Sequence, residues 1–314
     1  MTTKQPIDAR PHNLSYTQYA AWYQESIDDP ETFWGQRANE TLDWIRPWKT
    51  VYDGDLNRAT STWFKGGQLN VSANCIDRHL AHQANQTAII WEGDTPGTSK
   101  HISYQSLHDH VCQLANALKA RNIKKGDRVC IYMPMIVEAA YAMLACTRIG
   151  AIHCVVFGGF SAESLKERIL DANCHVVITA DTGIRGGQTI PLKANVDHAL
   201  LHCPQVHTNL VIRHTHEKIN WFPQRDVWYH QAVETQSTQC PPVAMDAEDP
   251  LFILYTSGST GKPKGVLHST AGYLLHCAFR QSISSIPQLA PSPSSHNATE
   301  INHTFISMLS LIHI

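Results

Sequence analysis

One stretch of the chain combines glycines, hydroxyls and lysines at a spacing that suits the binding of phosphate groups. It runs from residue 255 to 265 and reads Tyr-Thr-Ser-Gly-Ser-Thr-Gly-Lys-Pro-Lys-Gly. Its glycines permit backbone conformations that other residues rarely adopt, so successive N–H groups can turn toward one anion. The hydroxyls add donors, and the lysines add charge that attracts a polyphosphate. The candidate phosphate-binding residues are Thr256, Ser257, Gly258, Ser259, Thr260, Gly261, Lys262, Lys264 and Gly265.

The P-loop of nucleotide-binding proteins is the obvious alternative, but its spacing does not match. A P-loop has four residues between its first glycine and the Gly-Lys pair, and serine or threonine follows the lysine. Here two residues separate Gly258 from Gly261, and Pro263 follows Lys262. A flexible Gly/Ser linker would explain neither the spaced lysines nor the apolar run at 251–254. We therefore expect a strand that leads into a loop for the phosphates of a nucleoside triphosphate.

This stretch resembles the signature phosphate loop of the acyl-adenylate-forming enzymes, a superfamily of acyl-CoA synthetases, luciferases and peptide-synthetase adenylation domains. Three upstream segments resemble the acetyl-CoA synthetases within it. They are the Asp-Pro-Glu entry to an aromatic helix at 29–34, an aromatic loop with a Gly-Gly break at 63–72, and the run at 143–160. The resemblance extends from about residue 14 to about residue 279.

Alternating strand and helix patterns predict an α/β fold with a mostly parallel sheet flanked by helices. Buried-strand composition occurs at 88–91, 128–133, 152–157, 176–179 and 209–213, and helical periodicity at 14–46, 106–121 and 136–149. Right-handed crossovers gather ligand sites at the carboxyl ends of such strands, where the phosphate loop is expected. The resemblance implies a truncated large N-terminal domain of an acyl-adenylate-forming enzyme, preceded by a helical segment.

A second candidate ligand loop follows the strand at 176–179. Arg185 precedes Gly186 and Gly187, so its guanidinium and the accessible backbone N–H groups of the glycines can bind a phosphate there. The residues alone leave a surface turn with a solvated arginine equally open. In acetyl-CoA synthetases this loop contributes to the coenzyme A (CoA) site, so the resemblance implies CoA contacts from Arg185, Gly186, Gly187 and Gln188. A basic residue is expected where Gln188 stands, which weakens the case for a second charge contact.

The resemblance implies an AMP-forming acetate–CoA ligase that uses ATP and Mg²⁺ to make acetyl-AMP and then acetyl-CoA. In that family the adenine, ribose and acyl pockets and the C-terminal lysine lie beyond residue 279. No catalytic residue is therefore assigned, and the chain is expected to be an inactive fragment. A propionate–CoA ligase and a non-catalytic fragment that binds only nucleotide phosphates remain open.

Three regions are expected along the chain. An acetyl-CoA-synthetase-type segment occupies 1–72, and a partial AMP-dependent synthetase/ligase domain occupies 73–279. Residues 280–314 have only two formal charges and an apolar end, which favours an aberrant, disordered tail.

Composition favours small-molecule partners, and the resemblance implies that these are acetate, ATP and CoA. The chain is 43% hydrophobic with a formal charge of -2, which provides a core but no basic field for nucleic acid or membrane. Nine cysteines without a C-x-x-C pair, and no apolar signal segment, favour a cytoplasmic location. The nineteen histidines lack cysteine or carboxylate neighbours at ligand spacing, so no metal site is predicted.

Overall fold

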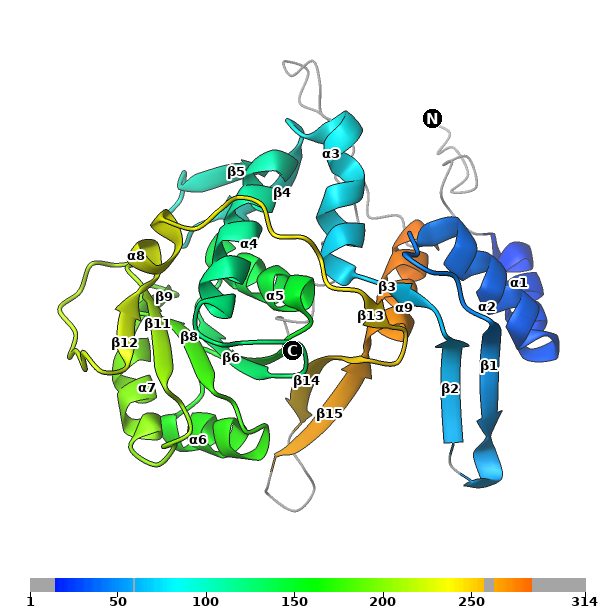
Figure 1. The fold of residues 1–314 in the computed structure, drawn as a ribbon. Coiled ribbons are helices and arrows are strands. Elements are labelled where there is room, and N and C mark those ends of the chain that lie inside the picture. The colour runs from blue at the N-terminus through cyan, green and yellow to red at the C-terminus, as the bar shows by residue number, and fades with distance from the viewer. Residues whose placement is uncertain (1–14, 59, 257–262, 284–314) are drawn as a thin grey trace, which may run out of the picture. The chain divides into compact units, whose positions relative to one another are not determined.

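The computed structural model describes residues 15–58, 60–256 and 263–283 (Figure 1). The chain divides into two compact units. The first contains the described parts of Met1–Leu69, Asp246–Glu248 and Ala271–Ile314, and the second contains Asn70–Met245 and Asp249–Thr270. The domain boundaries expected from the sequence, at 72/73 and 279/280, stay predictions.

The first unit begins with the two helices that the sequence predicts, but the second ends at Thr41 and not near residue 46, because the backbone becomes extended at Leu42. Its elements are α1 (Tyr16–Asp28), α2 (Pro30–Thr41), β1 (Thr50–Asp55), the 3₁₀ turn η2 (Leu56–Arg58), β2 (Thr60–Lys65) and β3 (Gln68–Leu69). The Asp29 side chain accepts a hydrogen bond from the N–H of Thr32 at 3.1 Å, as an N-cap does. The prediction of an aromatic loop at 63–72 is wrong in part, because Trp63 and Phe64 lie in strand β2. That strand pairs antiparallel with β1, and the Trp63 ring packs on Tyr52.

An aromatic cluster forms the core of the first unit. Helix α9 (Thr270–Ile283) contributes Phe279, whose ring centroid lies 5.9 Å from that of Phe33 and 5.8 Å from that of Trp22. The Arg37 guanidinium covers the Trp22 ring at 4.6 Å. Helix α9 thus continues past the residue at which the tail was expected to begin.

The second unit is built on a seven-stranded sheet, in the order β12-β11-β8-β6-β7-β14-β15. Neighbouring strands are parallel except β15, which runs antiparallel to β14. The sheet strands are β6 (Arg128–Met133), β7 (Ile152–Phe157), β8 (Val176–Ala180), β11 (Thr208–Ile212), β12 (Asp226–Trp228), β14 (Pro250–Thr256) and β15 (Lys264–Ser269). The predicted mostly parallel α/β fold is confirmed.

Helices cover both faces of this sheet (Figure 1). They are α3 (Arg78–Gln83), which continues the π-helical segment η3 (Ala73–Asp77), then α4 (Tyr104–Lys119), α5 (Val137–Ile149), α6 (Ala162–Asp171), α7 (Leu192–Leu200) and α8 (Tyr229–Glu234). The connection from β6 to β7 runs in one direction across the sheet, whereas those from β7 to β8 and from β8 to β11 run in the other. Right-handed crossovers therefore place α5 on one face and α6 and α7 on the opposite face. Helix α4 packs against α5, and α6 packs against α7.

Short strands complete the second unit outside the main sheet. They are β4 (Thr87–Glu92), β5 (Ser99–Ser103), β9 (Gly183–Arg185), β10 (Gln188–Ile190) and β13 (Met245–Asp246), of which β13 spans the boundary between the units. Gly150 caps the C-terminus of helix α5 and has a φ of 73°. A Cβ atom there would lie 2.6 Å from the Met245 sulfur, so glycine is required for both its backbone conformation and its lack of a side chain.

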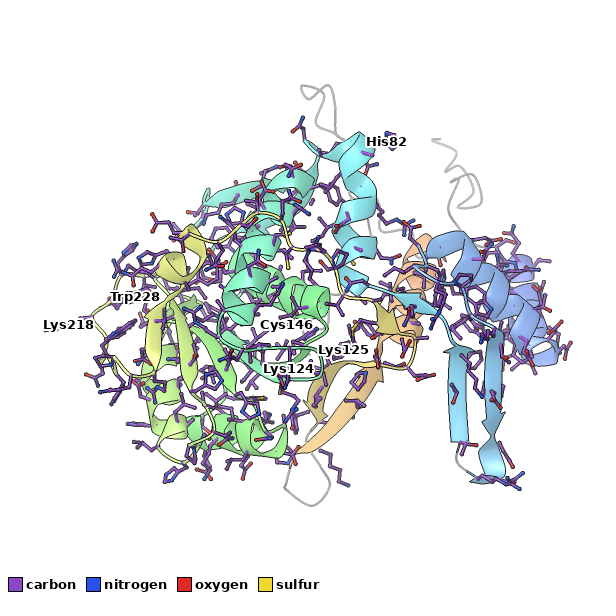
Figure 2. The ribbon with its side chains drawn as sticks, viewed as in Figure 1. His82, Lys124, Lys125, Cys146, Lys218 and Trp228 are labelled. Carbon is purple, nitrogen blue, oxygen red and sulfur yellow. The ribbon has the colours of Figure 1, made fainter. Side chains whose placement is uncertain are left out.

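All nine cysteines are buried free thiols, and Cys146 in α5 is one of them (Figure 2). Burial raises the pKa of Cys146 to about 12. None of the described helices combines the length and the apolar character that crossing a membrane requires.

Candidate ligand-binding site

The predicted phosphate loop connects the two strands of an antiparallel hairpin. Strand β14 contains the predicted run 251–254 and ends at Thr256, which pairs with Lys264 at the start of β15. Because β14 runs parallel to β7, Thr256 lies at the carboxyl edge of the sheet, where the sequence placed it. Thr256, Lys264 and Gly265 are exposed. The other candidates, Ser257, Gly258, Ser259, Thr260, Gly261 and Lys262, lie outside the described residues.

The base of this hairpin is attached to helix α6 through Tyr255. The Tyr255 hydroxyl donates a hydrogen bond to Asp171 Oδ2 at 2.6 Å. Burial, followed by the hydrogen bond to Asp171, raises the pKa of Tyr255 above its ordinary value. Tyr255 is therefore a neutral hydrogen-bond donor at neutral pH, and it fixes the end of β14 just before the loop.

A buried arginine lies beside this tyrosine. The Arg168 guanidinium is 5.4 Å from the Tyr255 ring centroid and 4.7 Å from that of Phe160, and the residue is only 6% exposed. It donates hydrogen bonds to the carbonyl and hydroxyl oxygens of Ser164. Within the described residues Arg168 forms no ion pair. Its positive charge is stabilised by ring faces and by a carbonyl, and it contributes to the potential at the base of the loop.

The second candidate loop is also a hairpin, made by β9 and β10. Gly186 and Gly187 form its turn with φ values of 55° and 75°, and Arg185 pairs with Gln188 across it. Two successive residues in the left-handed region match the type I′ turn that closes tight hairpins. All four predicted CoA-contacting residues are exposed. The Gly187 N–H donates to Asp94 Oδ2 at 3.1 Å, so a ligand can use this N–H only by displacing a carboxylate.

Aromatic rings connect the two candidate loops. The Arg185 guanidinium lies 4.9 Å from the Phe157 ring centroid. Phe157 meets Phe160 edge to face at 5.7 Å, and Phe160 contacts Arg168, which in turn covers Tyr255. Both loops therefore lie along one carboxyl edge and share a continuous row of side chains.

The sequence assigned no binding role to Phe157, Phe160 or Arg168. The Phe-Gly-Gly-Phe run at 157–160 was the available signal, since glycines between aromatic residues at the end of a strand often mark a close approach to a ligand. Arg168 gave no signal, because its role depends on contacts with residues far away in the sequence.

Asp181 connects the β9–β10 hairpin to the loop that follows β11. This fully buried carboxylate accepts hydrogen bonds from the N–H groups of Thr182, His214, Thr215 and His216 at 2.7 to 3.1 Å. Charge-assisted hydrogen bonds of this kind are strong. They hold the start of the β9–β10 hairpin against the start of the loop that follows β11.

The geometry is compatible with anionic ligands. Arg185 and Lys264 are exposed, and neither forms an ion pair within the described residues. In the same part of the chain, no group of three or more His, Cys, Asp or Glu residues could hold a metal ion.

Comparison with known families adds the decisive observation. A family model described as "AMP-binding enzyme" matches residues 76–314, and one described as "Acetyl-coenzyme A synthetase N-terminus" matches residues 19–75. The chain belongs to the AMP-binding enzyme family. The first of these matches includes the carboxyl edge that carries both hairpins.

Individual relatives agree with this assignment. Acetyl-coenzyme A synthetase 2 of Pseudomonas aeruginosa is 62% identical over 266 residues, which cover 85% of this chain and 41% of the relative. The acetyl-coenzyme A synthetase of Saccharophagus degradans is 58% identical over 267 residues, with the same coverage. This chain thus spans about 41% of the length of these relatives. The predicted resemblance to acetyl-CoA synthetases is confirmed.

A solved structure shows the same fold. The acetoacetyl-CoA synthetase from Streptomyces lividans superimposes with a TM-score of 0.76 at 25% sequence identity. The superposition covers 83% of this chain and 39% of that one.

Proposed function

We propose that this chain carries the ATP-phosphate site and part of the CoA site of an AMP-forming acetate–CoA ligase. The observation that carries the proposal is the position of the two hairpins along one carboxyl edge. An enzyme that activates an acid with ATP and then transfers the acyl group to a thiol must bind both cosubstrates close together. The names of the relatives support acetate as the acid.

Each hairpin has a distinct role in this proposal. Backbone N–H groups and hydroxyls between Thr256 and Gly265 hold the phosphates of ATP, and Lys262 and Lys264 offset their charge. Arg185, Gly186, Gly187 and Gln188 contact CoA, with the Arg185 guanidinium held in place by its stacking on Phe157. Bound Mg²⁺ would stabilise the negative charge that builds up as pyrophosphate leaves.

Binding of each cosubstrate can be tested by titration calorimetry on the purified chain. Lys264→Ala should weaken ATP·Mg binding by about tenfold and leave CoA binding unchanged, because one charge-assisted contact is lost. Arg185→Ala should do the reverse. Lys124→Ala is a matched control, since Lys124 is an exposed lysine of the same unit outside both hairpins. If neither ligand binds the unmodified chain, the proposal is wrong.

The activity itself is tested by exchange of labelled pyrophosphate into ATP, with acetate or propionate as the acid. The Pseudomonas aeruginosa relative serves as the positive control. Exchange that depends on acetate more than on propionate supports an acetate ligase, and the opposite preference supports a propionate ligase. Binding of ATP and CoA without exchange indicates that this chain carries only the binding parts.

We also infer a reducing, cytoplasmic location. The nine buried free thiols support it, because oxidising compartments favour disulfides. Fractionation of cells that express the chain, followed by immunoblotting, tests the location.

A further inference from the structure

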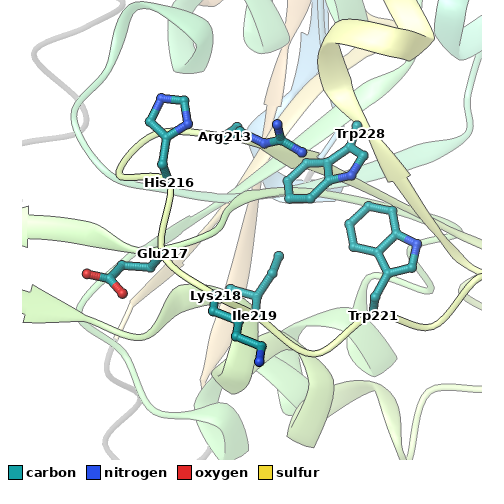
Figure 3. A pocket seen from close by; sticks show the side chains of 7 residues that line it. All are labelled: Arg213, His216, Glu217, Lys218, Ile219, Trp221 and Trp228. Carbon is teal, nitrogen blue, oxygen red and sulfur yellow. The ribbon is translucent and has the colours of Figure 1, made fainter.

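A pocket lies at the β12 end of the sheet, in a region to which the proposed function gives no role. It has a volume of about 360 Å³, within the range typical of small-molecule sites. Its walls come from the loop after β11 and from the end of β12, at the same carboxyl edge where ligands of α/β proteins gather. The lining residues used below are Arg213, His216, Lys218, Ile219, Trp221 and Trp228 (Figure 3).

Two stacked indoles form one wall of the pocket. The rings of Trp221 and Trp228 lie 4.4 Å apart with an interplanar angle of 23°, and the Arg213 guanidinium covers Trp228 at 4.3 Å. Both tryptophans are only half-buried, and Trp228 lies at the edge of the unit near Lys218 (Figure 2). Partly exposed tryptophans beside arginine are characteristic of binding surfaces, where the ring supplies apolar contact at little cost in conformational entropy.

Buried carboxylates hold the pocket loop at both ends. At its start, Asp181 accepts the N–H groups of three successive residues, the last of which is His216. At its end, Asp226 Oδ2 accepts the Phe222 N–H at 2.9 Å, and the buried Lys193 ammonium donates to the Asn220 carbonyl at 3.1 Å. The pocket is therefore built before any ligand arrives, which lowers the entropy lost on binding.

The charge of Asp226 shows how firmly the end of the loop is held. Burial alone would raise the pKa of Asp226, but hydrogen bonds from Lys193, Asn209 and the Phe222 N–H outweigh it and lower the pKa. Lys193 also contacts Asp197 at 2.6 Å, and Arg225 bridges both aspartates. Four charged groups thus anchor the loop against α7 and β12.

The backbone at the rim of the pocket adopts an uncommon conformation. His216 has a φ of 63°, in the left-handed region that residues other than glycine rarely occupy. Its N–H is held by Asp181, and its side chain lines the pocket. A backbone held in such a region by surrounding bonds is often found where a side chain must be presented to a ligand.

The charges around the pocket favour an anion. Arg213 and Lys218 are exposed, and neither forms an ion pair or a side-chain hydrogen bond within the described residues. Glu217 is the only acid in the lining, and Figure 3 shows it directed away from the indoles. An apolar wall with two available cations beside it suits a molecule that is flat and apolar at one end and negatively charged at the other.

We propose that this pocket binds a small molecule that carries an aromatic ring and a phosphate or carboxylate group. The ring packs against Ile219 and the stacked indoles, and the anion pairs with Arg213 and Lys218. The proposal does not depend on the proposed function, because it involves neither of the two hairpins.

Nuclear magnetic resonance of the ¹⁵N-labelled 314-residue chain tests this site directly. The indole N–H signals of Trp221 and Trp228 are assigned with Trp→Phe variants and followed during titration with phenyl phosphate. We expect saturable shifts of both signals, with a Kd at least about tenfold lower than for inorganic phosphate or phenol, since each supplies only half of the contacts. Benzylamine, a ring with a cation, should bind more weakly still.

Charge reversal provides the matched test. Lys218→Glu should weaken phenyl phosphate binding by about fivefold or more, whereas Lys124→Glu, at an exposed lysine away from the pocket, should leave it unchanged. Unshifted signals from the other tryptophans show that both variants remain folded. The proposal is overturned if phenyl phosphate leaves the Trp221 and Trp228 signals unmoved, if phenol or phosphate alone binds equally well, or if the two variants behave alike.

Discussion

The two hairpins that carry the candidate binding loops differ in what holds them in place. The β14–β15 hairpin belongs to the seven-stranded sheet, and the rings of His153, Phe252 and His268 stack across β7, β14 and β15 with centroid separations of 5.2 and 4.5 Å. Tyr255 adds the bond to Asp171. This hairpin depends on contacts between distant parts of the chain.

Beyond the anchor that Asp181 provides at its start, the β9–β10 hairpin depends mainly on its own backbone. It forms a separate two-stranded sheet with an exposed glycine turn, and its outer contacts include those of Arg185 with Phe157 and Gly187 with Asp94. A loop of this kind opens at low free-energy cost, whereas the base of the β14–β15 hairpin opens only with the sheet. The comparison indicates that the base of the β14–β15 hairpin is rigid and that the β9–β10 hairpin is more adaptable.

The two hairpins should differ most in the free energy of unfolding that is lost when an apolar side chain is truncated. Phe252→Ala should lower the free energy of unfolding by about 3–5 kcal/mol, because Phe252 is 2% exposed and lies between two rings. Ile184→Ala in the other hairpin should cost less than about 1 kcal/mol, because Ile184 is 44% exposed. Urea unfolding followed by circular dichroism measures both. Equal losses would contradict the difference in anchoring.

Acid should loosen the anchored hairpin through His153. Burial lowers its pKa to about 3, and neither ring nitrogen has a hydrogen-bond partner among the described residues. Below the unfolded-state pKa of about 6.5, the unfolded chain takes up a proton that the folded chain does not. The free energy of unfolding should therefore fall as the pH decreases from about 6.5 toward 3, by roughly 2 kcal/mol between pH 6.5 and 5.

Unfolding by urea at pH 7, 6 and 5 measures this slope. His153→Phe keeps a ring at the position but cannot take up a proton, so it should flatten the slope. Burial also lowers the pKa of His268, which leaves a residual dependence of the same sign. An unchanged slope in the variant would exclude His153 as the source.

A smaller effect is expected at Tyr255. Tyr255→Phe keeps the ring beside Arg168 but removes the hydrogen bond to Asp171, which should cost about 1 kcal/mol. Hydrogen exchange of the β14 and β15 amides should accelerate, while that of β9 and β10 stays unchanged. Asp171→Asn keeps an acceptor and should have a weaker effect. Faster exchange in both hairpins would mean that they are not anchored separately.

The smallest effect on global stability is expected at the glycine turn. No atom lies within 4 Å of a Cβ placed on Gly187, but its φ of 75° disfavours any other residue. Gly187→Ala should destabilise the hairpin locally by about 1 kcal/mol and leave the unfolding midpoint nearly unchanged. Gly187→Asn should be milder, because asparagine tolerates the left-handed region. Hydrogen exchange at residues 183–190 distinguishes the two variants.

The sequence predicted features whose causes are local. Periodicity and capping predicted the two helices that lie within 14–46 and the helix at 136–149, and the apolar run at 251–254 predicted the strand before the candidate phosphate loop. The sequence predicted a loop at 185–188 but not the hairpin that it closes, because three-residue strands have too little periodicity to detect. The CoA contacts of that loop stay a prediction.

Features that depend on tertiary contacts were not predicted. The contact between Tyr255 and Asp171 joins residues 84 positions apart, and it exists only because the fold brings the last residue of α6 to the end of β14. The pocket at Trp221 and Trp228 likewise requires β12 to pair with β11, and β12 has only three residues. Propensity and pattern carry no information about which distant side chains such pairings bring together.

Asp181 has a consequence for protein engineering. Its two oxygens serve the start of the hairpin at Thr182 and three successive N–H groups of the loop after β11. An insertion between residues 213 and 216 would move those N–H groups out of reach and disturb the neighbouring hairpin as well. Insertions such as affinity tags or fluorescent reporters should therefore leave the fold intact when placed after His216, toward Glu217 and Lys218. Insertions before His216 should destabilise it. One buried carboxylate thus sets where this edge of the molecule can be lengthened.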